Sequence, residues 1–507
     1  MTLAIVHSRA SVGVAAPQVD IEAHLGAGLP AFTIVGLPEA SVRESRERVR
    51  SALLTSQYEF PARRITVNLA PADLPKGGGR FDLPIALGIL CASGQLPPEQ
   101  LDKYEFAGEL ALDGSLRKID GAIPLAIAAA EAGRTLILPE QSALEAQRVE
   151  GCKVLAANHL LAVAAHLRGA QPLTAPPTEA AYTPELDYPD MHDVKGQYLA
   201  KRALTIAAAG NHHLLFFGPP GTGKSMLASR LPGILPPMDQ QQALESSAVY
   251  SVSHQGFDPS HWRKRPFRAP HHSCSAIALV GGGSHPKPGE ISLAHHGVLF
   301  LDELTEYDRR VLEMLREPLE NGHVTISRAA NQSEFPARFQ LIAAMNPSPC
   351  GTWGDPSVQS RSTPDQVKRY LNKLSGPFID RFDLTVDVPR VSPKELAALP
   401  DDGHNSATIA SSVATAHQQA MSRQGVANAQ LGGKALDQHC KLTAEGNRFL
   451  GDAIDKLGLS ARAYHRVLRV ARTIADLEQA AQIQEQHLAE ALGFRAFDRF
   501  LARLNAA

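Results

Sequence analysis

The segment GPPGTGKS, residues 218–225, has the residue types and spacing of a loop that wraps around phosphate groups. It follows the apolar run LLFF and opens the run MLASRL, so a strand, a loop and a helix are expected in that order. Glycines let backbone N–H groups close around phosphate oxygens, and a lysine reaches the β and γ phosphates. The sequence therefore predicts an ATP site made of Gly218, Pro219, Pro220, Gly221, Thr222, Gly223, Lys224 and Ser225.

Two acidic residues end a second apolar run, VLFLDE, 78 residues after Lys224. Asp302 is expected to hold Mg²⁺ together with the Ser225 hydroxyl, and Glu303 is expected to polarise the attacking water. A glycine-rich turn and two surface acids could show the same letters by chance, but rarely in this order and context. ATP is thus the predicted substrate and Mg²⁺ the predicted cofactor.

Three further polar residues complete the expected site. Asn346 ends the apolar run LIAAM and can orient the water, although an isolated asparagine in that place is as often a turn former. FIDRFDL supplies Arg381, and SARAYHR supplies Arg462. The ordered set resembles AAA+ ATPases, and the resemblance implies that Arg381 acts on a neighbouring subunit's nucleotide within a ring, and that Val194 lies near the adenine. Whether Arg462 serves its own subunit or its neighbour stays open.

Composition and length describe the kind of chain that carries these motifs. The 507 residues are too many for one core and suggest about three domains. A hydrophobic fraction of 44% and a net charge of −2 are typical of a globular protein, so nucleic-acid binding would have to be local. Five cysteines without paired spacing indicate a reducing, cytoplasmic setting. We expect neither a signal peptide nor a membrane helix.

Changes of pattern along the chain suggest four segments. Residues 1–170 alternate short β-branched runs with helical stretches, and residues 171–191 contain five prolines and indicate a linker. Residues 192–400 are expected to form the α/β ATPase core, because their apolar runs suit a sheet covered on both faces. Residues 401–507 are predicted to be a helical lid.

Longer stretches identify the family. VGLPEASVRESRERVRSAL, NLAPADLPKGGGRFDLPIAL, FRAPHHSCSAIALVGGGSHPKPGEISLAHHGVLFLDEL and LSGPFIDRFDL resemble the ComM/YifB family of magnesium-chelatase-like AAA+ proteins over nearly the whole chain. The resemblance implies a three-layer α/β core with an insert in its second helix, and a hexameric ring helicase that drives DNA branch migration in recombination and natural transformation. The alternative is a chelatase-like or chaperone-like remodeller that acts on a protein partner.

The stretch RKRPFRAPHHS, residues 263–273, could hold a metal or a polyanion. His271 and His272 are adjacent, so on a strand they would face opposite sides, and no Asp or Glu occurs from Pro259 to Gly289. Cations without acids favour an anion. A solvated basic loop is the plainer alternative, but the family inserts a pore hairpin in this region. The predicted DNA contacts here are Arg263, Lys264, Arg265, Arg268 and Lys287.

A second hairpin is expected in VTISRAANQSEFPARF, just ahead of Asn346. Arg328 falls where the related minichromosome-maintenance helicases place a pore lysine, so the resemblance implies a further contact to the DNA backbone. Backbone contacts carry no base information, and binding is therefore expected to depend on DNA structure and salt rather than on sequence.

Two departures limit what the resemblances imply. The N-terminal region resembles the α+β proteolytic domain of Lon and the matching domain of RadA, yet Arg80 stands at the serine position and Ile123 near the lysine position, so no protease is expected. PKGGGR, with Lys76 and Arg80, could cradle phosphate or form a plain turn. Some relatives pair cysteines where this chain has Ser348, Cys350, Ser360 and Ser362, and one thiolate predicts no structural zinc.

Overall fold

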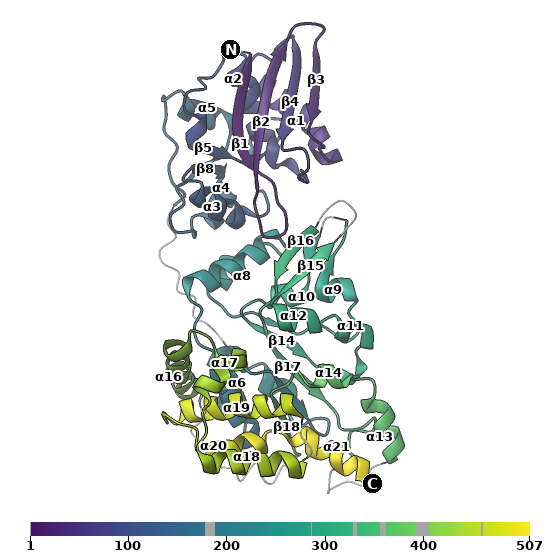
Figure 1. Ribbon diagram of the computed structural model, residues 1–507. Helices are drawn as coiled ribbons and strands as arrows, with labels where there is room; N and C mark the ends of the chain where they lie inside the picture. The colour runs from purple at the N-terminus through teal and green to yellow at the C-terminus, as the bar shows by residue number, and fades with distance from the viewer. Residues whose placement is uncertain are drawn as a thin grey trace.

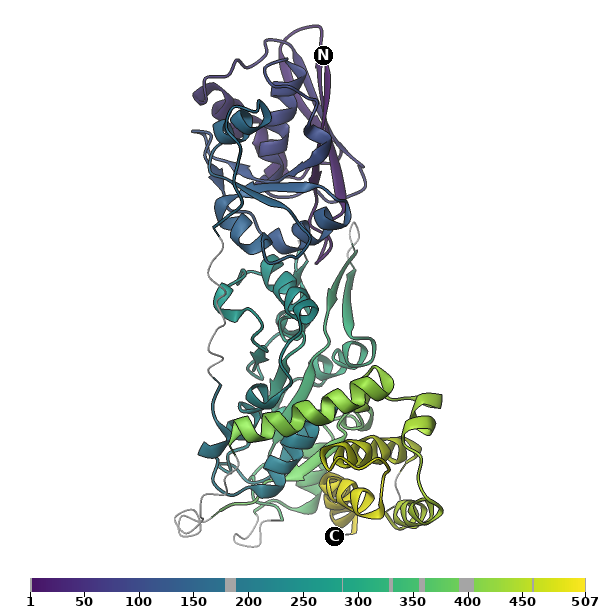
Figure 2. The same cartoon turned by 90° about the vertical axis from the view of Figure 1, so that its left-hand side faces the viewer.

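The computed structural model describes residues 2–177, 188–284, 286–327, 332–354, 361–391, 405–457 and 460–506. Figure 1 shows an elongated molecule, with the N-terminal region at one end and helices beside the C-terminus at the other. A central region built around a parallel sheet lies between them (Figure 2). No helix within the described ranges has the length and apolar character needed to span a bilayer.

The N-terminal region is built on a seven-stranded mixed sheet. In spatial order its strands are β3 (Ala31–Val35), β4 (Arg64–Ala70), β2 (Gln18–Gly26), β1 (Leu3–Arg9), β5 (Tyr104–Phe106), β8 (Thr135–Pro139) and β9 (Val154–Ala157). β1, β2 and β4 pair antiparallel, whereas β3 and the β5–β8–β9 part pair parallel to their neighbours. The helices are α1 (Ala40–Thr55), α2 (Asp82–Ala92), α3 (Ala122–Glu131), α4 (Glu140–Ala146) and α5 (Leu160–Leu167).

Side-chain alternation explains how the helices cover this sheet. In β8, Ile137 belongs to the apolar cluster that includes α2 and α5, whereas Leu136 and Leu138 belong to the cluster that includes α3 and α4. Successive side chains of a strand point to opposite faces, so this part of the sheet is covered on both sides. Strands β1 to β4 place α1 and α2 against one face only (Figure 1).

The central sheet has five parallel strands. Their spatial order is β11 (Phe267–Arg268), β14 (Val298–Leu301), β17 (Gln340–Met345), β10 (Leu214–Phe217) and β18 (Leu384–Asp387). All residues of β10, β14 and β17 are buried, which confirms the expectation of a parallel sheet covered on both faces. Parallel strands bring their carboxyl ends to one edge, and the loops after β14, β17 and β10 therefore lie side by side there.

Helices and two small hairpins surround this sheet. The hairpins are β12–β13 (Gly281–Gly282 and Lys287–Pro288) and β15–β16 (His323–Ser327 and Gln332–Pro336), and the second one rises toward the N-terminal region in both ribbon views. Arg328 lies outside the described residues. The helices are α6 (Tyr198–Gly210), α7 (Lys224–Ala228), α8 (Gln240–Val252), α9 (Ala276–Val280), α10 (Glu290–Leu293), α11 (Arg309–Glu313), α12 (Arg316–Asn321), α13 (Pro364–Leu371) and α14 (Gly376–Ile379).

The C-terminal region is helical, as its sequence pattern predicts. It comprises α16 (Ser406–Gln424), α17 (Gly433–His439), α18 (Ala444–Leu457), α19 (Ala461–Leu477), α20 (Glu485–Gly493) and α21 (Ala496–Ala506). α19 packs against both α6 and α16, and its Ser460 side chain caps its first turn. One apolar cluster runs from β10 and α6 into these helices, so the region shares a core with the central sheet.

The N-terminal and central regions meet mainly through α3 and α8. An apolar cluster joins Ile119 and Ile123 to Met238 and Ala248, and the Gly121 N–H donates to the Ser251 carbonyl at 2.8 Å. This contact combines apolar burial with a backbone hydrogen bond, so α8 is tied to the N-terminal region.

Two further contacts reach the hairpins. The Lys287 ammonium lies 3.8 Å from the Asp120 carboxylate, and Gly13, in the turn between β1 and β2, leaves room for the Glu334 carbonyl. A Cβ at Gly13 would lie 2.6 Å from that oxygen. The N-terminal region therefore contacts β12–β13 through a side chain and β15–β16 through backbone.

Candidate active site

The predicted phosphate loop joins β10 to α7 at the carboxyl edge of the central sheet. Gly221 and Gly223 have φ angles of 77° and 86°, in the left-handed region that side chains disfavour. At Gly218 a Cβ would lie 2.4 Å from the Val388 carbonyl, because the loop runs close to the end of β18. These glycines allow a tight turn whose backbone leads directly into the first residue of α7, Lys224.

Lys224 is held inside this loop. Its ammonium donates to the carbonyls of Gly218 at 2.9 Å and Pro219 at 2.8 Å, and it lies 3.3 Å from the Asn346 side-chain oxygen. Burial lowers the pKa of Lys224 to about 8, against the opposing influence of the Asp302 and Asp387 carboxylates. A buried cation among neutral carbonyls is a suitable partner for incoming phosphate oxygens.

The two acids after β14 have different environments. The Ser225 hydroxyl donates to the Asp302 carboxylate at 2.5 Å, so the two predicted Mg²⁺ ligands already lie together. Both are oxygen ligands of the kind that Mg²⁺ prefers, and the residues present therefore fit the ion. Glu303, with a φ of 49°, turns away into the left-handed region and exposes 57% of its side chain. It can act at the reacting water while Asp302 faces the loop.

His272 is a member of this site that the sequence analysis missed. Its Nδ1 lies 3.1 Å from the Glu303 carboxylate, although no acid is near it in the sequence. The pair exists because β11 lies beside β14, which brings the loop after each strand to the same edge. The Tyr307 hydroxyl donates to the Pro270 carbonyl at 2.5 Å and fixes this loop.

The expected opposite orientation of the two histidines is wrong. His271 and His272 lie in a turn after β11 rather than within a strand, and their ring centroids are 4.1 Å apart. A cavity of about 430 Å³ is lined by the His272, Glu303, Asp302 and Ser225 side chains, so the turn closes over the phosphate edge.

Asn346 follows β17, between the loops that carry Asp302 and Lys224. Its contact to Lys224 places its amide at the phosphate edge. Gly351, further along the same loop, contacts Pro220 of the phosphate loop. The polar groups that the sequence placed after three separate strands therefore do converge.

Arg381 and Arg462 lie elsewhere. Arg381 precedes β18, whose first residue pairs with the first residue of β10, so it lies at the amino edge of the sheet. Four residues of β10 span about 13 Å between that edge and the phosphate loop. The Arg381 guanidinium forms an ion pair with Glu320, and this hydrogen bond, with the nearby charges of Arg316 and Arg462, lowers the pKa of Glu320. Arg462 is exposed at the start of α19.

The entry segment of the core also contacts the phosphate loop. Val194 is buried in the main apolar cluster of the central region. The Gln197 amide donates to the carbonyls of Pro389 at 2.9 Å and Thr222 at 3.5 Å. Val194 is thus close in sequence to a residue that bridges the phosphate loop and the segment after β18.

Comparisons with known proteins place this site in a family. Three family models match: "Subunit ChlI of Mg-chelatase" over residues 21–142, "Magnesium chelatase, subunit ChlI" over residues 190–396, and its C-terminal model over residues 403–495. The competence protein ComM of Haemophilus influenzae is 53% identical over 510 residues, which cover 100% of both chains. The chain belongs to the ComM/YifB family of magnesium-chelatase-like AAA+ proteins.

Other relatives span the same family. YifB of Escherichia coli is 51% identical over 504 residues, covering 99% of each chain. The 38 kDa magnesium-chelatase subunit of Cereibacter sphaeroides is 24% identical over 325 residues, which cover 58% of this chain and 87% of the relative. Membership of this family implies the use of a nucleotide and Mg²⁺, in agreement with the residues gathered at the phosphate edge.

The cations predicted to bind DNA in this ComM/YifB chain do not form one surface. Arg265 donates to the carbonyls of Pro236 and His296, both at 2.6 Å, and burial lowers its pKa to about 10. Arg268 lies in β11 and pairs with Glu290 at 2.6 Å. Both guanidiniums therefore have partners within the protein and are less available to a DNA backbone than exposed cations.

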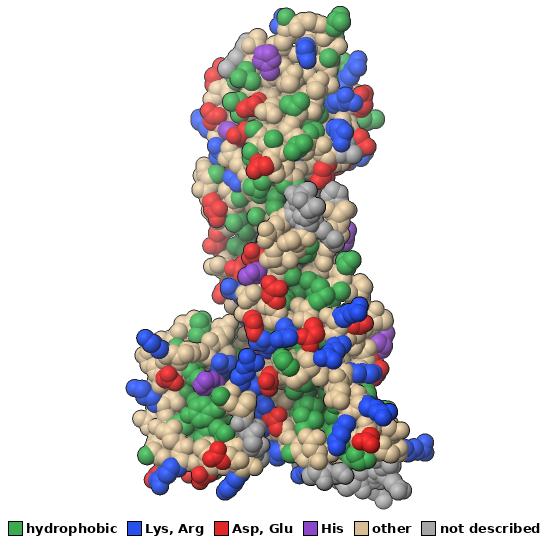
Figure 3. All heavy atoms as spheres, turned by 45° about the vertical axis from the view of Figure 1, so that its right-hand side comes forward, with side chains coloured by type: hydrophobic (Ala, Val, Ile, Leu, Met, Phe, Trp, Pro, Cys, Tyr) green, Lys and Arg blue, Asp and Glu red, His purple; other side chains and the backbone are tan. Residues whose placement is uncertain are grey.

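The other three predicted DNA contacts have separate partners. Arg263 donates to the Gln240 side chain at 2.8 Å, and Lys264 lies over the Tyr188 ring. Lys287 is in β13 and donates to the Val252 carbonyl at 2.8 Å. Residues 263–268 do not form a hairpin, because Phe267–Arg268 is the edge strand β11 of the central sheet; the hairpin in this part of the chain is β12–β13. On the face drawn in Figure 3, acidic side chains lie between the basic ones.

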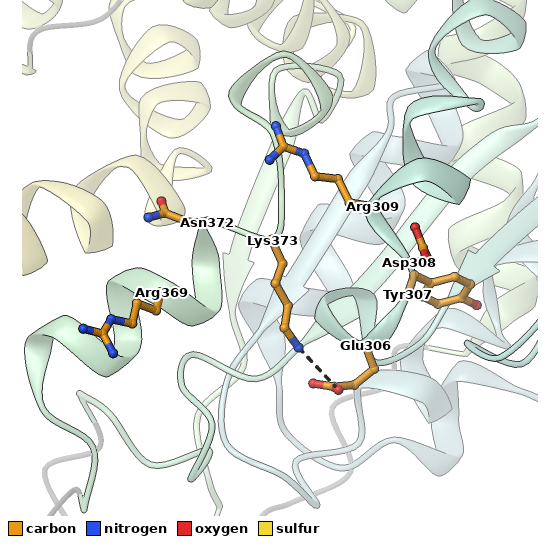
Figure 4. A pocket seen from close by; sticks show the side chains of 7 residues that line it. All are labelled: Glu306, Tyr307, Asp308, Arg309, Arg369, Asn372 and Lys373. Atoms are coloured by element: carbon orange, nitrogen blue, oxygen red, sulfur yellow. Dashed lines mark ion pairs between the residues drawn. The ribbon is translucent and has the colours of Figure 1, made fainter.

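A second open hollow, of about 620 Å³, lies beside the phosphate edge (Figure 4). Arg309 and Arg369 border it from opposite sides, and the Lys373 ammonium reaches across it to the Glu306 carboxylate at 3.7 Å. Asp308 caps α11 by accepting the Arg310 N–H. Acids thus offset much of the positive charge of this hollow.

Within the described ranges, one cluster of three residues, Glu245, His295 and His296, has metal-ligand spacing. The Nδ1 of His295 accepts the Arg338 N–H at 3.0 Å, so its Nε2 carries a proton and faces the Glu245 carboxylate at 3.3 Å. A protonated ring nitrogen is not a metal ligand. The cluster is therefore a hydrogen-bonded pair of imidazoles on a carboxylate rather than a metal centre.

Three of the positions that carry cysteines in some relatives do meet in space. The Cys350 sulfur lies 3.3 Å from the Ser348 hydroxyl and 3.1 Å from the Ser362 hydroxyl, while Ser360 lies outside the described residues. The arrangement has the compactness of a metal site with hydroxyls in place of thiolates. Zinc prefers sulfur and nitrogen ligands, so these residue types do not fit it.

In the N-terminal region, Arg80 contacts the residues just before Ile123. The Arg80 guanidinium donates to the Asp120 carbonyl at 3.0 Å, burial lowers its pKa to about 10, and Ile123 is fully buried. The Lys76 ammonium donates to the carbonyls of Gly36, Pro71 and Leu74 and has no exposed surface. The phosphate-cradle reading of PKGGGR is therefore wrong, and the segment is a structural turn.

Proposed function

We propose that this chain is an ATP-driven, ring-forming DNA translocase with branch-migration activity. Its phosphate loop would hold ATP through backbone N–H groups and Lys224, while Ser225 and Asp302 would hold Mg²⁺, which neutralises charge on the phosphates when bound. Glu303 would take a proton from the attacking water, and Asn346 would orient that water. In the chain without nucleotide, His272 would restrain the Glu303 carboxylate by competing with the water for it.

The location of Arg381 is the observation that supports assembly of the chain into a ring. It lies at the amino edge of the sheet, opposite the phosphate loop of its own chain, so it supports a role at the nucleotide of a neighbouring subunit. Arg466, one turn after Arg462, donates to the Phe382 carbonyl and the Asp380 carboxylate, which puts Arg462 near Arg381. Arg462 is therefore proposed to act on the neighbour as well. Trans arginines of this kind can raise hydrolysis by ~10³–10⁵-fold.

Two observations support DNA as the proposed partner: the family to which the chain belongs and the two hairpins of the central region. The most similar relatives include a competence protein, and β12–β13 and β15–β16 are the elements that would face a ring's pore. Lys287 in β13 and Arg328 remain the proposed contacts to the DNA backbone, together with Arg263 and Lys264. The alternative is a remodeller of a protein partner, favoured by the similarity to the magnesium-chelatase subunit.

Subunit mixing tests the shared site. Lys224→Ala and Arg381→Ala chains are each expected to be inactive, but a 1:1 mixture should recover hydrolysis, because about a quarter of randomly formed interfaces combine an intact lysine with an intact arginine. Arg310→Ala serves as the matched control on an exposed arginine. No recovery in assembled mixed rings would contradict the trans assignment.

The DNA assignment needs its own measurement. ATPase activity of the full chain is compared without DNA, with a linear duplex and with a four-way junction, at two salt concentrations. A several-fold rise with the junction that weakens at higher salt is expected of the motor. An unchanged rate with every DNA, in a chain that hydrolyses ATP, would favour the protein remodeller.

A further inference from the structure

A cavity of about 370 Å³ shares the lining residue Phe267 with the cavity at the phosphate edge. It opens between α8, Ser229 just after α7, and the segment that precedes β11. Four aromatic side chains line it, namely those of Tyr188, Tyr250, Phe257 and Phe267. Its size and apolar walls are those of a small-molecule site, which typically begins at about 300 Å³.

Two serine hydroxyls face this cavity without partners. Ser246 and Ser247 are 6% and 5% exposed, and neither hydroxyl has a hydrogen bond to any part of the chain that the structure describes. A hydroxyl can donate one hydrogen bond and accept others. Two neighbouring hydroxyls in one mainly apolar cavity therefore suit a polar group of an occupant.

The available charge is that of Lys264. Its ammonium lies 5.5 Å from the centre of the Tyr188 ring and has no carboxylate partner in the described ranges. Arg265 and Arg268 also line the cavity, but their donors are directed at backbone carbonyls and Glu290. The Asp258 carboxylate is turned into its own cap, where it accepts the Ser260 N–H at 2.9 Å. A cation and two hydroxyls that line the same cavity are suited to an oxyanion.

We propose that this cavity binds a planar ring that carries a phosphate or carboxylate, of the size of a nucleoside monophosphate. The ring would lie against the aromatic walls, where stacking of a base on an aromatic side chain stabilises the complex. The oxyanion would meet Lys264 and the two hydroxyls. A free mononucleotide and the terminal nucleotide of a single strand share this chemistry. The site is separate from the ATP edge and does not depend on the proposed motor function.

An occupant would contact the phosphate-loop helix. Ser229 lines the cavity and directly follows α7, which begins at Lys224, and Phe267 lines both this cavity and the one at the phosphate edge. The two cavities thus share a wall and a helix. Binding in the second one is positioned to affect nucleotide affinity in the first.

Calorimetry with AMP on the full chain tests the proposal. A Lys224→Ala background silences the phosphate loop, and AMP is expected to bind once per chain. Lys264→Ala should weaken binding at least about ten-fold, because it removes a charge-assisted bond. Arg263→Ala is the matched control, since that guanidinium donates to Gln240 and does not line the cavity. Ser247→Leu should fill the cavity and abolish binding, with thermal unfolding showing that the chain is folded.

A second arm separates the two sources of the ligand. A short oligothymidylate that competes with AMP, when an abasic strand of equal length does not, assigns the cavity to single strands. Competition by neither strand leaves the free mononucleotide as the ligand. Absence of AMP binding together with no difference between the two strands overturns the proposal, and so does equal AMP affinity of Lys264→Ala and Arg263→Ala.

Discussion

Two glycine-rich segments with one lysine each, GPPGTGKS and PKGGGR, place their lysines in different environments. Lys224 bonds the carbonyls of its own loop beside a cavity that also holds Ser225 and Asp302. Lys76 bonds three carbonyls from two parts of the chain and has no exposed surface. The two segments have similar residue types, but only the first one connects a buried strand to a helix at the carboxyl edge of a parallel sheet. Context, rather than composition, makes a phosphate site.

The largest expected effect comes from removing the first lysine. Lys224→Met is expected to lower the ATP hydrolysis rate by at least about 10²–10³-fold, since it deletes a charged donor aimed at the transferred phosphate. The thermal unfolding midpoint is measured alongside, because Lys224→Met also leaves the Gly218 and Pro219 carbonyls without their donor. Arg202→Met, a surface cation that pairs with Glu490 on α20, serves as the control for loss of charge. A folded Lys224→Met chain with normal hydrolysis would contradict the site.

The second lysine should show the reverse behaviour. Lys76→Met leaves three buried carbonyls without a donor and is expected to lower the free energy of unfolding of the N-terminal region by about 2 kcal/mol. Hydrolysis per folded chain should stay unchanged. Denaturant unfolding of the N-terminal region measures its free energy of unfolding. An ATPase assay on the folded fraction measures the hydrolysis rate. A loss of hydrolysis without a loss of stability would show that PKGGGR takes part in function after all.

The pH dependence sharpens the same contrast. The folded pKa of Lys224, about 8, lies below the value of a free lysine, so its charge is lost in the folded protein as pH rises through 8. ATP affinity of the free chain should fall above pH 8, and the Lys224→Arg variant should abolish that fall. The lowered pKa means that the unfolded chain binds more protons between pH 8 and the free value, so this group adds stability as pH rises there. Titration of ATP binding from pH 7 to 9.5 provides the measurement.

The smallest effect is expected at the histidine that joins the phosphate edge. His272→Ala releases Glu303 from a partly exposed pair, which is worth at most about 1 kcal/mol, so the basal kcat is expected to rise by up to about five-fold with KM unchanged. His271→Ala is the matched neighbour and should have no effect. Equal rates in both variants would remove His272 from the site.

The strands of the central sheet, the phosphate loop and the polar residues after three strands could be predicted from the sequence. Each of these features depends only on residues that are adjacent in the chain. Asp302, Asn346 and Lys224 meet because parallel strands share one carboxyl edge, and that follows from the apolar runs alone. The partner of His272 could not be read, because Glu303 reaches it only through the adjacency of β11 and β14.

The basic stretch, residues 263–287, shows what could not be predicted from charged residues alone. Five cations without an acid in sequence predicted a free positive surface, yet Glu290, the first acid after that stretch, neutralises Arg268, and backbone carbonyls from a distant turn enclose Arg265. Carbonyl acceptors are invisible in a sequence, since every residue has one. A run of charge therefore predicts how polar a segment is, but it does not predict which way its side chains turn.

The turn at Gly13 has a mechanical consequence. Its backbone lies so close to β16 that no side chain fits between them. Asp120 of the N-terminal region lies near Lys287 of the other hairpin, β12–β13. Contacts this short tolerate very little sliding, so a displacement of β15–β16 either carries the N-terminal region along or breaks the contact completely. Any movement of β15–β16 that keeps this contact would then also move the N-terminal region.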